Sequence, residues 1–207
     1  MCYTRGMCQP YQTVQAPASA ALVVERSRFI GHCLEVADEP AAKDFILQIR
    51  AEHAQANHNC YAYRIGSGAH LLEYFNDHGE PSGTAGKPIL GAIQRRNLTN
   101  VVVVVTRYFG GKKLGVRGLI EAYGQAATAV LAAAGAVTRI PRFRAELRYG
   151  YADHALILHR LQQVEAEVIE SLFAEAVTTR LQIPAAQRER FQKLLAELPV
   201  TATEIQA

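Results

Sequence analysis

The stretch Asn100–Thr106 reads NVVVVVT and contains five consecutive valines. β-Branched side chains fit the extended backbone of a pleated sheet. A strand with one face in water alternates apolar and polar residues, whereas this run does not alternate. The run therefore predicts a strand that is buried on both faces, and other elements must cover each side of it.

Three helices are expected around this strand. Val116–Ala134 is rich in alanine and has few helix breakers, and Glu39–His53 carries apolar residues at intervals of three and four. A shorter helix is expected at Pro88–Arg96. The other strands are expected at Thr13–Glu25, Arg28–Val36, Cys60–Ile65, His70–Asn76 and Ala136–Phe143, with Gly66–Gly68 as a hairpin turn and residues 1–12 as a loose tail.

A second domain is expected after Pro141, so that residues 1–142 and 143–207 form two domains. The later pattern is a strand, a helix, two strands, a helix and a strand, which is the ferredoxin-like βαββαβ order. Asp153 is expected to cap the first helix, and Pro184 suits the start of the second. The elements are expected at Arg144–Tyr151, Asp153–Val164, Glu167–Phe173, Glu175–Ile183, Ala185–Leu198 and Thr201–Glu204.

The composition is that of an ordinary globular protein. The chain has 207 residues, of which 49% are hydrophobic and 20% are charged, and this excludes a disordered or fibrous protein. No apolar run approaches the roughly 18 residues that cross a bilayer, and the first residues lack a hydrophobic signal core. We therefore expect a cytoplasmic protein that has no membrane partner.

The four cysteines are expected to be free and reduced. None of them forms a C-x-x-C pair, and a chain of this size needs no disulfide. Zinc would need a tighter grouping of ligands than Cys2, Cys8, Cys33 and Cys60 offer. Neither a metal nor a cofactor is expected.

The net charge of +3 hides an uneven distribution. Residues 1–142 contain 15 basic and 10 acidic residues, whereas residues 143–207 contain 7 and 9. Within residues 77–118 there are seven basic residues and only two acidic ones, together with eight of the 15 glycines. This basic, glycine-rich segment is where a polyanionic partner is most readily accommodated.

The loop Arg107–Gly115 (RYFGGKKLG) lies between the valine strand and the long helix. Backbone amides at the start of a helix attract anions, and glycines let a phosphate approach the backbone. The alternative is a tight glycine turn with solvated lysines and with aromatic residues that anchor the loop on the core. The candidate residues for binding an anion or a nucleic acid are Lys87, Arg107, Tyr108, Phe109, Gly110, Gly111, Lys112, Lys113 and Arg117.

Familiar nucleotide-binding loops are excluded. Gly86-Lys87 is followed by Pro88, where a Walker A loop needs Ser or Thr. The pattern after Gly66-Ser67-Gly68 does not complete a G-x-G-x-x-G fingerprint.

A second candidate site lies in the loop Asp77–Lys87 (DHGEPSGTAGK). Asp77, His78, Glu80 and Thr84 are residue types that perform general acid–base catalysis. The same residues also suit a structured turn, because Asp and Thr accept hydrogen bonds from backbone amides. Their spacing does not match a metal cage.

Histidines near Cys60 allow a further hypothesis. His53 and His58 precede Cys60, and on an extended strand His58 and Cys60 share a face. A Cys–His nucleophilic pair is one interpretation, and a buried structural cysteine is the other.

Four ordered motifs resemble the IMPACT family, in particular its bacterial YigZ-like members. They are Glu25–Gly31, His58–Tyr63, Asp77–Pro88 and Val104–Gly115. The resemblance implies an N-terminal α+β sandwich domain of the kind found in a small-subunit ribosomal protein, followed by a ferredoxin-like domain similar to the last domain of elongation factor G. Eukaryotic members are linked to control of translation through a protein partner, and nucleic-acid binding is the usual inference for bacterial members.

Two positions depart from the family pattern. The family commonly has Gly where Arg117 stands and a basic residue where Glu121 stands. The two residues are four apart on the expected helix, so we expect them to form an ion pair.

Three functions remain open on the sequence. The first is binding of RNA or of ribosome-associated factors through a basic glycine-rich cleft. The second is a small-molecule or phosphoester-processing enzyme with its site between the 77–88 and 106–115 loops. The third is a protein-interaction module that docks a partner through its acidic C-terminal domain.

Overall fold

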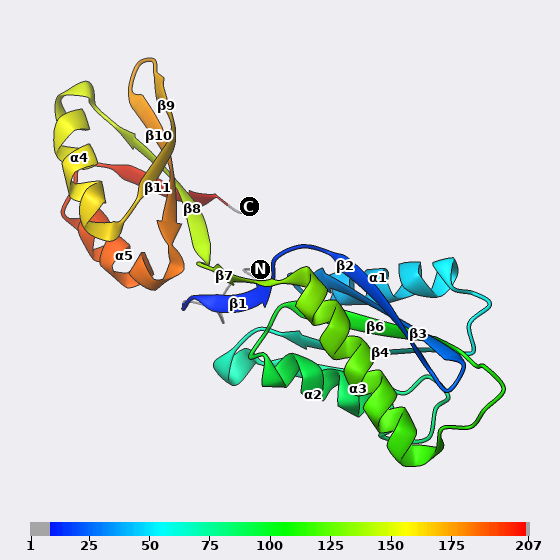
Figure 1. The fold of residues 1–207 in the computed structure, drawn as a ribbon. Coiled ribbons are helices and arrows are strands. Elements are labelled where there is room, and N and C mark those ends of the chain that lie inside the picture. Colours follow the sequence, from blue (N-terminus) through cyan, green and yellow to red (C-terminus); the bar gives the residue numbers. More distant parts are fainter. Residues whose placement is uncertain (1–8, 206–207) are drawn as a thin grey trace. The chain divides into compact units, whose positions relative to one another are not determined.

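The computed structural model describes residues 9–205 (Figure 1). The chain divides into two compact units, Tyr11–Arg139 and the part from Ile140 onward. The division falls close to Pro141, where the sequence predicts the domain boundary. Among the described residues, no helix is both long and apolar enough to cross a membrane.

The first unit contains two antiparallel sheets. The smaller one pairs β1 (Tyr11–Val14) with β7 (Ala136–Arg139). The larger one has the strand order β2-β3-β6-β4-β5, so that β6 lies at its centre. Its strands are β2 (Ala18–Val24), β3 (Ser27–Glu35), β4 (His58–Ile65), β5 (Leu72–Asn76) and β6 (Val101–Tyr108).

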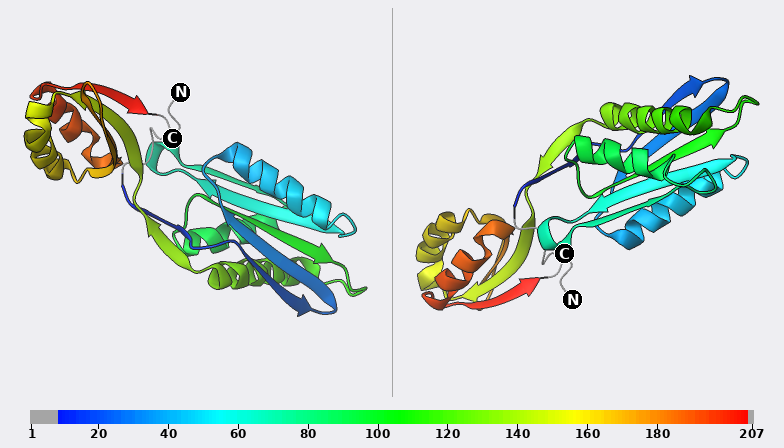
Figure 2. Two further views of the ribbon diagram at one scale, coloured as in Figure 1. Left: turned by 90° about the horizontal axis from the view of Figure 1, so that it is seen from above. Right: turned by 90° about the horizontal axis from the view of Figure 1, so that it is seen from below.

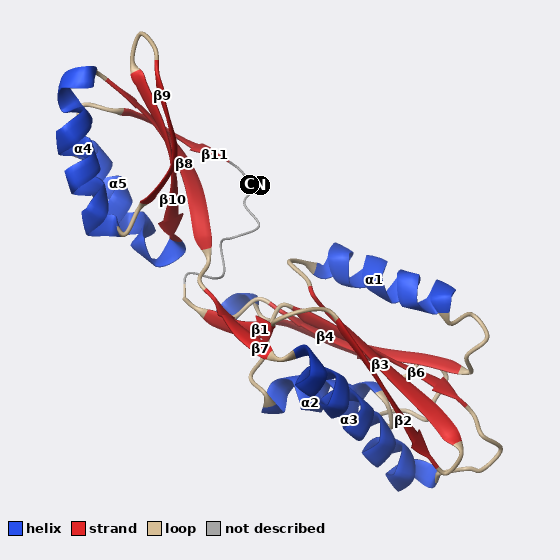
Figure 3. Ribbon diagram, turned by 45° about the horizontal axis from the view of Figure 1, so that its top comes forward, coloured by secondary structure: helices blue, strands red, loops and turns tan. Residues whose placement is uncertain are grey.

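Helices cover both faces of the larger sheet (Figure 3). α2 (Gly86–Arg95) and α3 (Gly115–Ala134) pack on one face, and α1 (Glu39–Glu52) packs on the other. The valines of β6 alternate between two cores: Val101, Val103 and Val105 lie under α2 and α3, and Val102 and Val104 lie under α1. The prediction of a strand buried on both faces is confirmed.

Local sequence explains where two of these helices lie. Asp38 Oδ1 accepts a hydrogen bond from the Ala41 amide at 2.9 Å and so caps α1. Small residues let α3 approach the sheet closely. A Cβ at Gly31 of β3 would lie 2.9 Å from Val130 Cγ1 of α3, so only glycine fits there.

Two predicted strands were wrong in extent. Thr13–Glu25 is not one strand but parts of β1 and β2, because Pro17 has no amide hydrogen for a ladder and the chain changes sheet there. Ala136–Phe143 divides in the same way at Pro141, between β7 and β8. The expected loose tail is wrong for Tyr11 and Gln12, which pair with β7, and its residues 1–8 lie outside the described residues.

The two glycine-rich loops are shorter than expected. β6 continues through Arg107 and Tyr108, so the second loop comprises residues 109–114. α2 begins at Gly86 rather than at Pro88, so the first loop ends at Ala85.

The second unit has the predicted βαββαβ order and is ferredoxin-like. Its strand order is β11-β8-β10-β9, and both helices lie on the same face of the sheet (yellow and orange in Figure 2). The elements are β8 (Arg142–Tyr149), α4 (His154–Leu161), β9 (Glu167–Phe173), β10 (Val177–Pro184), α5 (Arg188–Ala196) and β11 (Thr201–Ile205).

Two predicted helix starts in this unit need correction. Asp153 makes no side-chain capping bond, because it belongs to a 3₁₀ turn, Tyr151–Asp153, and an N-cap residue needs an extended backbone. Pro184 ends β10, and another 3₁₀ turn, Ala185–Gln187, separates it from α5.

Candidate functional site

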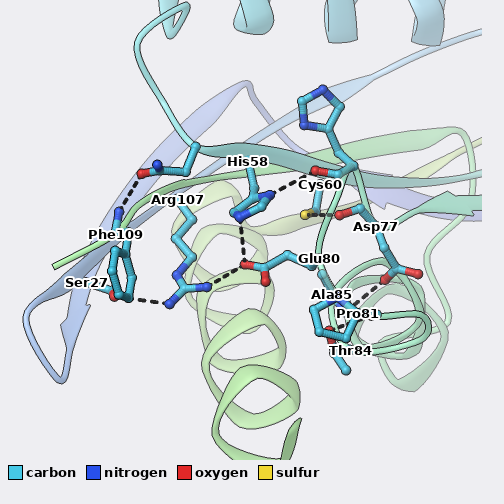
Figure 4. A network of polar contacts seen from close by, with 12 residues as sticks. Ser27, His58, Cys60, Asp77, Glu80, Pro81, Thr84, Ala85, Arg107 and Phe109 are labelled. Carbon is cyan, nitrogen blue, oxygen red and sulfur yellow. Dashed lines mark hydrogen bonds and ion pairs between the residues drawn. The ribbon is translucent and has the colours of Figure 1, made fainter. Parts of the chain in front are cut away.

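A buried ion pair joins the first glycine-rich loop to the strand that leads into the second. Arg107 Nη1 of β6 donates to Glu80 Oε1 at 2.6 Å (Figure 4). The side chains are 6% and 4% exposed, so neither charge faces water. Burial of this kind is tolerated because the two charges are paired.

Further contacts complete the surroundings of this pair. Tyr123 of α3 donates its hydroxyl to Glu80 Oε1 at 2.8 Å, and His58 Nε2 lies 3.8 Å from the same oxygen. Arg107 Nη2 donates to Ser27 Oγ at 3.3 Å. The guanidinium of Arg107 is therefore held inside the unit, and the structure does not present it to a phosphate as the sequence suggested.

The side-chain carboxylate of Asp77 organises the first loop by accepting hydrogen bonds from backbone amides of that loop. Its Oδ1 accepts hydrogen bonds from the amides of Ala85 and Gly86, and its Oδ2 accepts one from Gly83, at 2.8–3.0 Å. Thr84 is buried and donates its hydroxyl to the Pro81 carbonyl at 2.7 Å. These contacts are those of a structured turn, and Asp77 satisfies the first amides of α2.

His78 forms its hydrogen bond with β4 rather than with the residues of its own loop. Its Nδ1 accepts a hydrogen bond from the Asn59 amide at 3.0 Å. Burial, followed by the nearby charges of Arg50 and His58, lowers the pKa of His78, so the imidazole is neutral at pH 7. Asp77, His78, Glu80 and Thr84 thus have separate partners, and the structure does not gather them around one point.

Cys60 lies on the same side of β4 as His58, as expected, but it has the environment of a structural thiol (Figure 4). Its Sγ donates to the Asp77 carbonyl at 2.9 Å and lies 3.4 Å from the Tyr123 hydroxyl. Burial raises the pKa of this thiol to about 12, so it carries no thiolate at neutral pH. Cys60 and Cys33 are both free and buried. Across residues 9–205, no three His, Cys, Asp or Glu side chains are grouped as metal ligands.

The second loop is fixed at its start and exposed beyond it. The Phe109 amide donates to Asn57 Oδ1 at 2.8 Å, while the Phe109 ring is 45% exposed (Figure 4). A Cβ at Gly110 would lie 2.0 Å from the Arg26 carbonyl oxygen, so this position requires glycine. Gly111 has a φ of +85°, which also favours glycine.

Tyr108 and Phe109 are separated by the sheet. The Tyr108 hydroxyl lies 2.9 Å from Nδ1 of His53, the residue that follows α1. Tyr108 therefore belongs to the α1 face, and only Phe109 of the two aromatic residues stands at the exposed loop.

The N-terminus of α3 has no capping side chain. Leu114 makes no capping bond, and the first turn contains no acidic residue. Lys112 and Lys113 precede this turn and are exposed. The first amides of α3 and the Lys113 ammonium group form a positive surface, and the Lys112 ammonium beside them is paired with Glu25.

The remaining basic candidates lie on the surface. Arg117 of α3 is exposed and donates to Glu121 Oε1 at 2.9 Å, which confirms the predicted ion pair. Lys112 pairs with Glu25 of the turn between β2 and β3. Lys87 is exposed in the first turn of α2.

The comparison with known proteins gives the family. The Impact N-terminal domain matches residues 25–131, and a domain of unknown function matches residues 147–198. The IMPACT family member YvyE of Bacillus subtilis is 37% identical over 93% of this chain and 88% of its own length. The chain belongs to the IMPACT family.

Other relatives extend over similar lengths. The IMPACT family member YigZ of Escherichia coli is 33% identical over 88% of this chain and 90% of its own. A crystal structure described only as that of a hypothetical protein is 30% identical, with a TM-score of 0.66 over 96% of this chain and 98% of its own. Protein IMPACT of Rattus norvegicus is 34% identical, but the match covers 46% of this chain and 31% of the rat protein.

The IMPACT motifs meet at the Glu80–Arg107 pair, but the sequence analysis missed two residues around this pair, Ser27 and Tyr123, and one that holds the second loop, Asn57. Ser27 lies in the first family motif, and Tyr123 is the single aromatic residue of the alanine-rich helix α3, so both carried a signal. Asn57 carried none, because an asparagine in a polar loop is ordinary.

Proposed function

We propose that this IMPACT family protein binds single-stranded RNA through the 109–118 surface. This surface comprises the Phe109 ring, Lys112, Lys113 and the first backbone amides of α3. The observation that carries the proposal is the uncapped, exposed start of α3 directly after two lysines.

A phosphate group matches this surface. The first amides of a helix have no partner within the helix, and the helix dipole places partial positive charge there. α2 offers no such place, because Asp77 already accepts from its first amides. The anion therefore binds beside α3, and the two loops do not have to form one cleft around it.

Phe109 supplies an aromatic face beside the phosphate. Phe109 is 45% exposed, and the Arg107 guanidinium lies 5.4 Å from the centre of its ring. The bond from its amide to Asn57 holds the backbone in place. An unpaired base stacks on such a ring, and this stacking favours single-stranded over double-stranded RNA.

Salt-dependent binding tests the proposal. We expect the fluorescence anisotropy of a labelled single-stranded RNA to report binding at low salt that weakens steeply as salt rises. Replacing both Lys112 and Lys113 by alanine should lower the slope of log K against log salt by about 0.7 for each phosphate that these lysines neutralise. Lys43→Ala is the matched control, because Lys43, like Lys112, is exposed and paired with a glutamate.

Phe109 is tested separately. Phe109→Ala should weaken binding by about 1–3 kcal/mol and leave the salt slope unchanged, because stacking releases no counterions. No binding at low salt, or equal slopes for the wild type and the double lysine variant, would contradict the proposal. Docking of a protein through the acidic second domain stays a prediction, which charge reversal on that domain tests.

A further inference from the structure

Two histidines meet on the α1 face of the sheet, away from the proposed RNA surface. His32 lies on β3, and His53 follows the last residue of α1. Their Nε2 atoms are 3.2 Å apart, and their ring centres are 5.1 Å apart. Neither side chain takes part in the Glu80–Arg107 network, so the pair requires its own explanation.

The two distances together indicate how the rings point. Two imidazole nitrogens bound to one tetrahedral Zn²⁺ at about 2.05 Å lie about 3.3 Å apart, which places the ring centres about 5.2 Å apart. A collinear N–H···N hydrogen bond with a nitrogen separation of 3.2 Å would place the ring centres about 5.5 Å apart. The observed separations of 3.2 Å between the nitrogens and 5.1 Å between the ring centres are close to those of two histidines on one metal ion, and a bent N–H···N bond has similar values.

We propose that His32 and His53 form an open two-histidine site for Zn²⁺ or a similar divalent transition metal. Imidazole nitrogen is a preferred ligand of these ions. The described residues bring no third side chain of a ligand type into the group, so water completes the coordination. Such a site binds metal reversibly and differs from a closed structural zinc site.

Tyr108 acts as a positioning residue for this site. Its hydroxyl lies 2.9 Å from His53 Nδ1, and when the Nδ1–H group donates a hydrogen bond to the tyrosine oxygen, Nε2 carries the free lone pair. Metal-binding histidines in proteins are commonly oriented in this way through their other ring nitrogen.

The protonation state of the pair suits a metal ligand. Burial and, after it, the charge of His53 lower the pKa of His32, while Glu52 raises it by a smaller amount. His32 is therefore neutral at pH 7, and the neutral form is the one that binds metal. The nearby Glu52 carboxylate also favours a cation at this place.

Titration with zinc alone tests the site. The full chain carrying Cys2→Ser and Cys8→Ser, which removes two competing thiols, is titrated with zinc chloride in a calorimeter. We expect one equivalent to bind, and we expect His32→Ala or His53→Ala to weaken this binding at least about tenfold. Tyr108→Phe should weaken it by a similar factor, and His70→Ala is the control that should not change it.

A second measurement separates metal binding from loss of fold. Long-range ¹H–¹⁵N NMR spectra should show the Nε2 resonances of His32 and His53 moving on addition of zinc, and His53→Gln should abolish the shift of His32. Zinc binding that survives both alanine variants, or no binding at millimolar zinc, would overturn the proposal and leave a hydrogen-bonded histidine pair.

Discussion

Glu80 and Arg107 form an ion pair of 2.6 Å in which both side chains are almost completely buried. The two residues are 27 positions apart and connect the turn before α2 with the last residues of β6. Tyr123 donates a further hydrogen bond to the same carboxylate. The pair therefore holds the loop, the sheet and α3 together, and we expect it to contribute to the stability of the fold.

Removing one partner should destabilise the unit strongly. Glu80→Ala leaves the Arg107 charge buried without a counter-charge, which costs about 3–5 kcal/mol in comparable cases. Urea unfolding followed by circular dichroism measures this loss. Glu121→Ala removes the exposed partner of Arg117 and should change stability by less than about 1 kcal/mol. Equal effects of the two changes would show that Glu80 has no special role.

Asp77 should stabilise the protein through the three hydrogen bonds that its carboxylate accepts from backbone amides. Asp77→Ala leaves the amides of Gly83, Ala85 and Gly86 without this acceptor, and we expect a loss of about 2–3 kcal/mol. Hydrogen exchange at these three amides should accelerate in the variant. The matched control is Asp153→Ala, because Asp153 also precedes a helix but makes no capping bond. Unchanged exchange at the three amides would contradict the assignment.

The buried thiols should make the protein less stable in alkali. Burial raises the pKa of Cys33 to about 11 and that of Cys60 to about 12, from an ordinary value of 9.0. Between pH 9 and these values the unfolded chain releases protons that the native state retains, so stability falls as pH rises. Between pH 8 and pH 9.5 the expected loss is about 0.8 kcal/mol for each thiol.

Unfolding free energies at pH 8 and pH 9.5 measure this loss. Cys60→Ala should remove the part of the decrease in unfolding free energy that the Cys60 thiol causes, because alanine does not titrate. A decrease that is equally steep in Cys33→Ala and Cys60→Ala as in the wild type would assign the effect to other groups.

The sequence predicts the centre of the fold better than its edges. The run Val101–Val105 predicts its own environment, because β-branched residues without polar alternation favour a strand that is covered on both faces. The break after Val14 was missed because a single Pro17 interrupts an otherwise continuous apolar pattern. Periodicity identifies buried faces, whereas strand ends depend on partners that are distant in sequence.

The candidate site shows the same limit at the level of side chains. Arg107 lies in a basic, glycine-rich stretch and was predicted to contact phosphate, yet its partner Glu80 lies on another loop. A local pattern gives the charge of a residue but not the direction of its side chain, which here follows from the packing of β6 against α3. Lys112 and Lys113 are exposed, as their place between two glycine-rich segments indicates.

The pairing of Arg117 with Glu121 gives a last prediction, which rests on the proposed RNA binding. Glu121 is an acid on the second turn of α3, close to the proposed phosphate position, and it engages Arg117 at 2.9 Å. Glu121→Gln removes the negative charge and releases Arg117, so RNA affinity at low salt should rise about three- to tenfold with a steeper salt slope. Glu189→Gln, an exposed acid on α5, is the control for the change in net charge. If the two variants gain affinity equally, the gain reflects overall charge and α3 is not the contact; if Glu121→Gln alone gains, the phosphate lies within reach of Arg117.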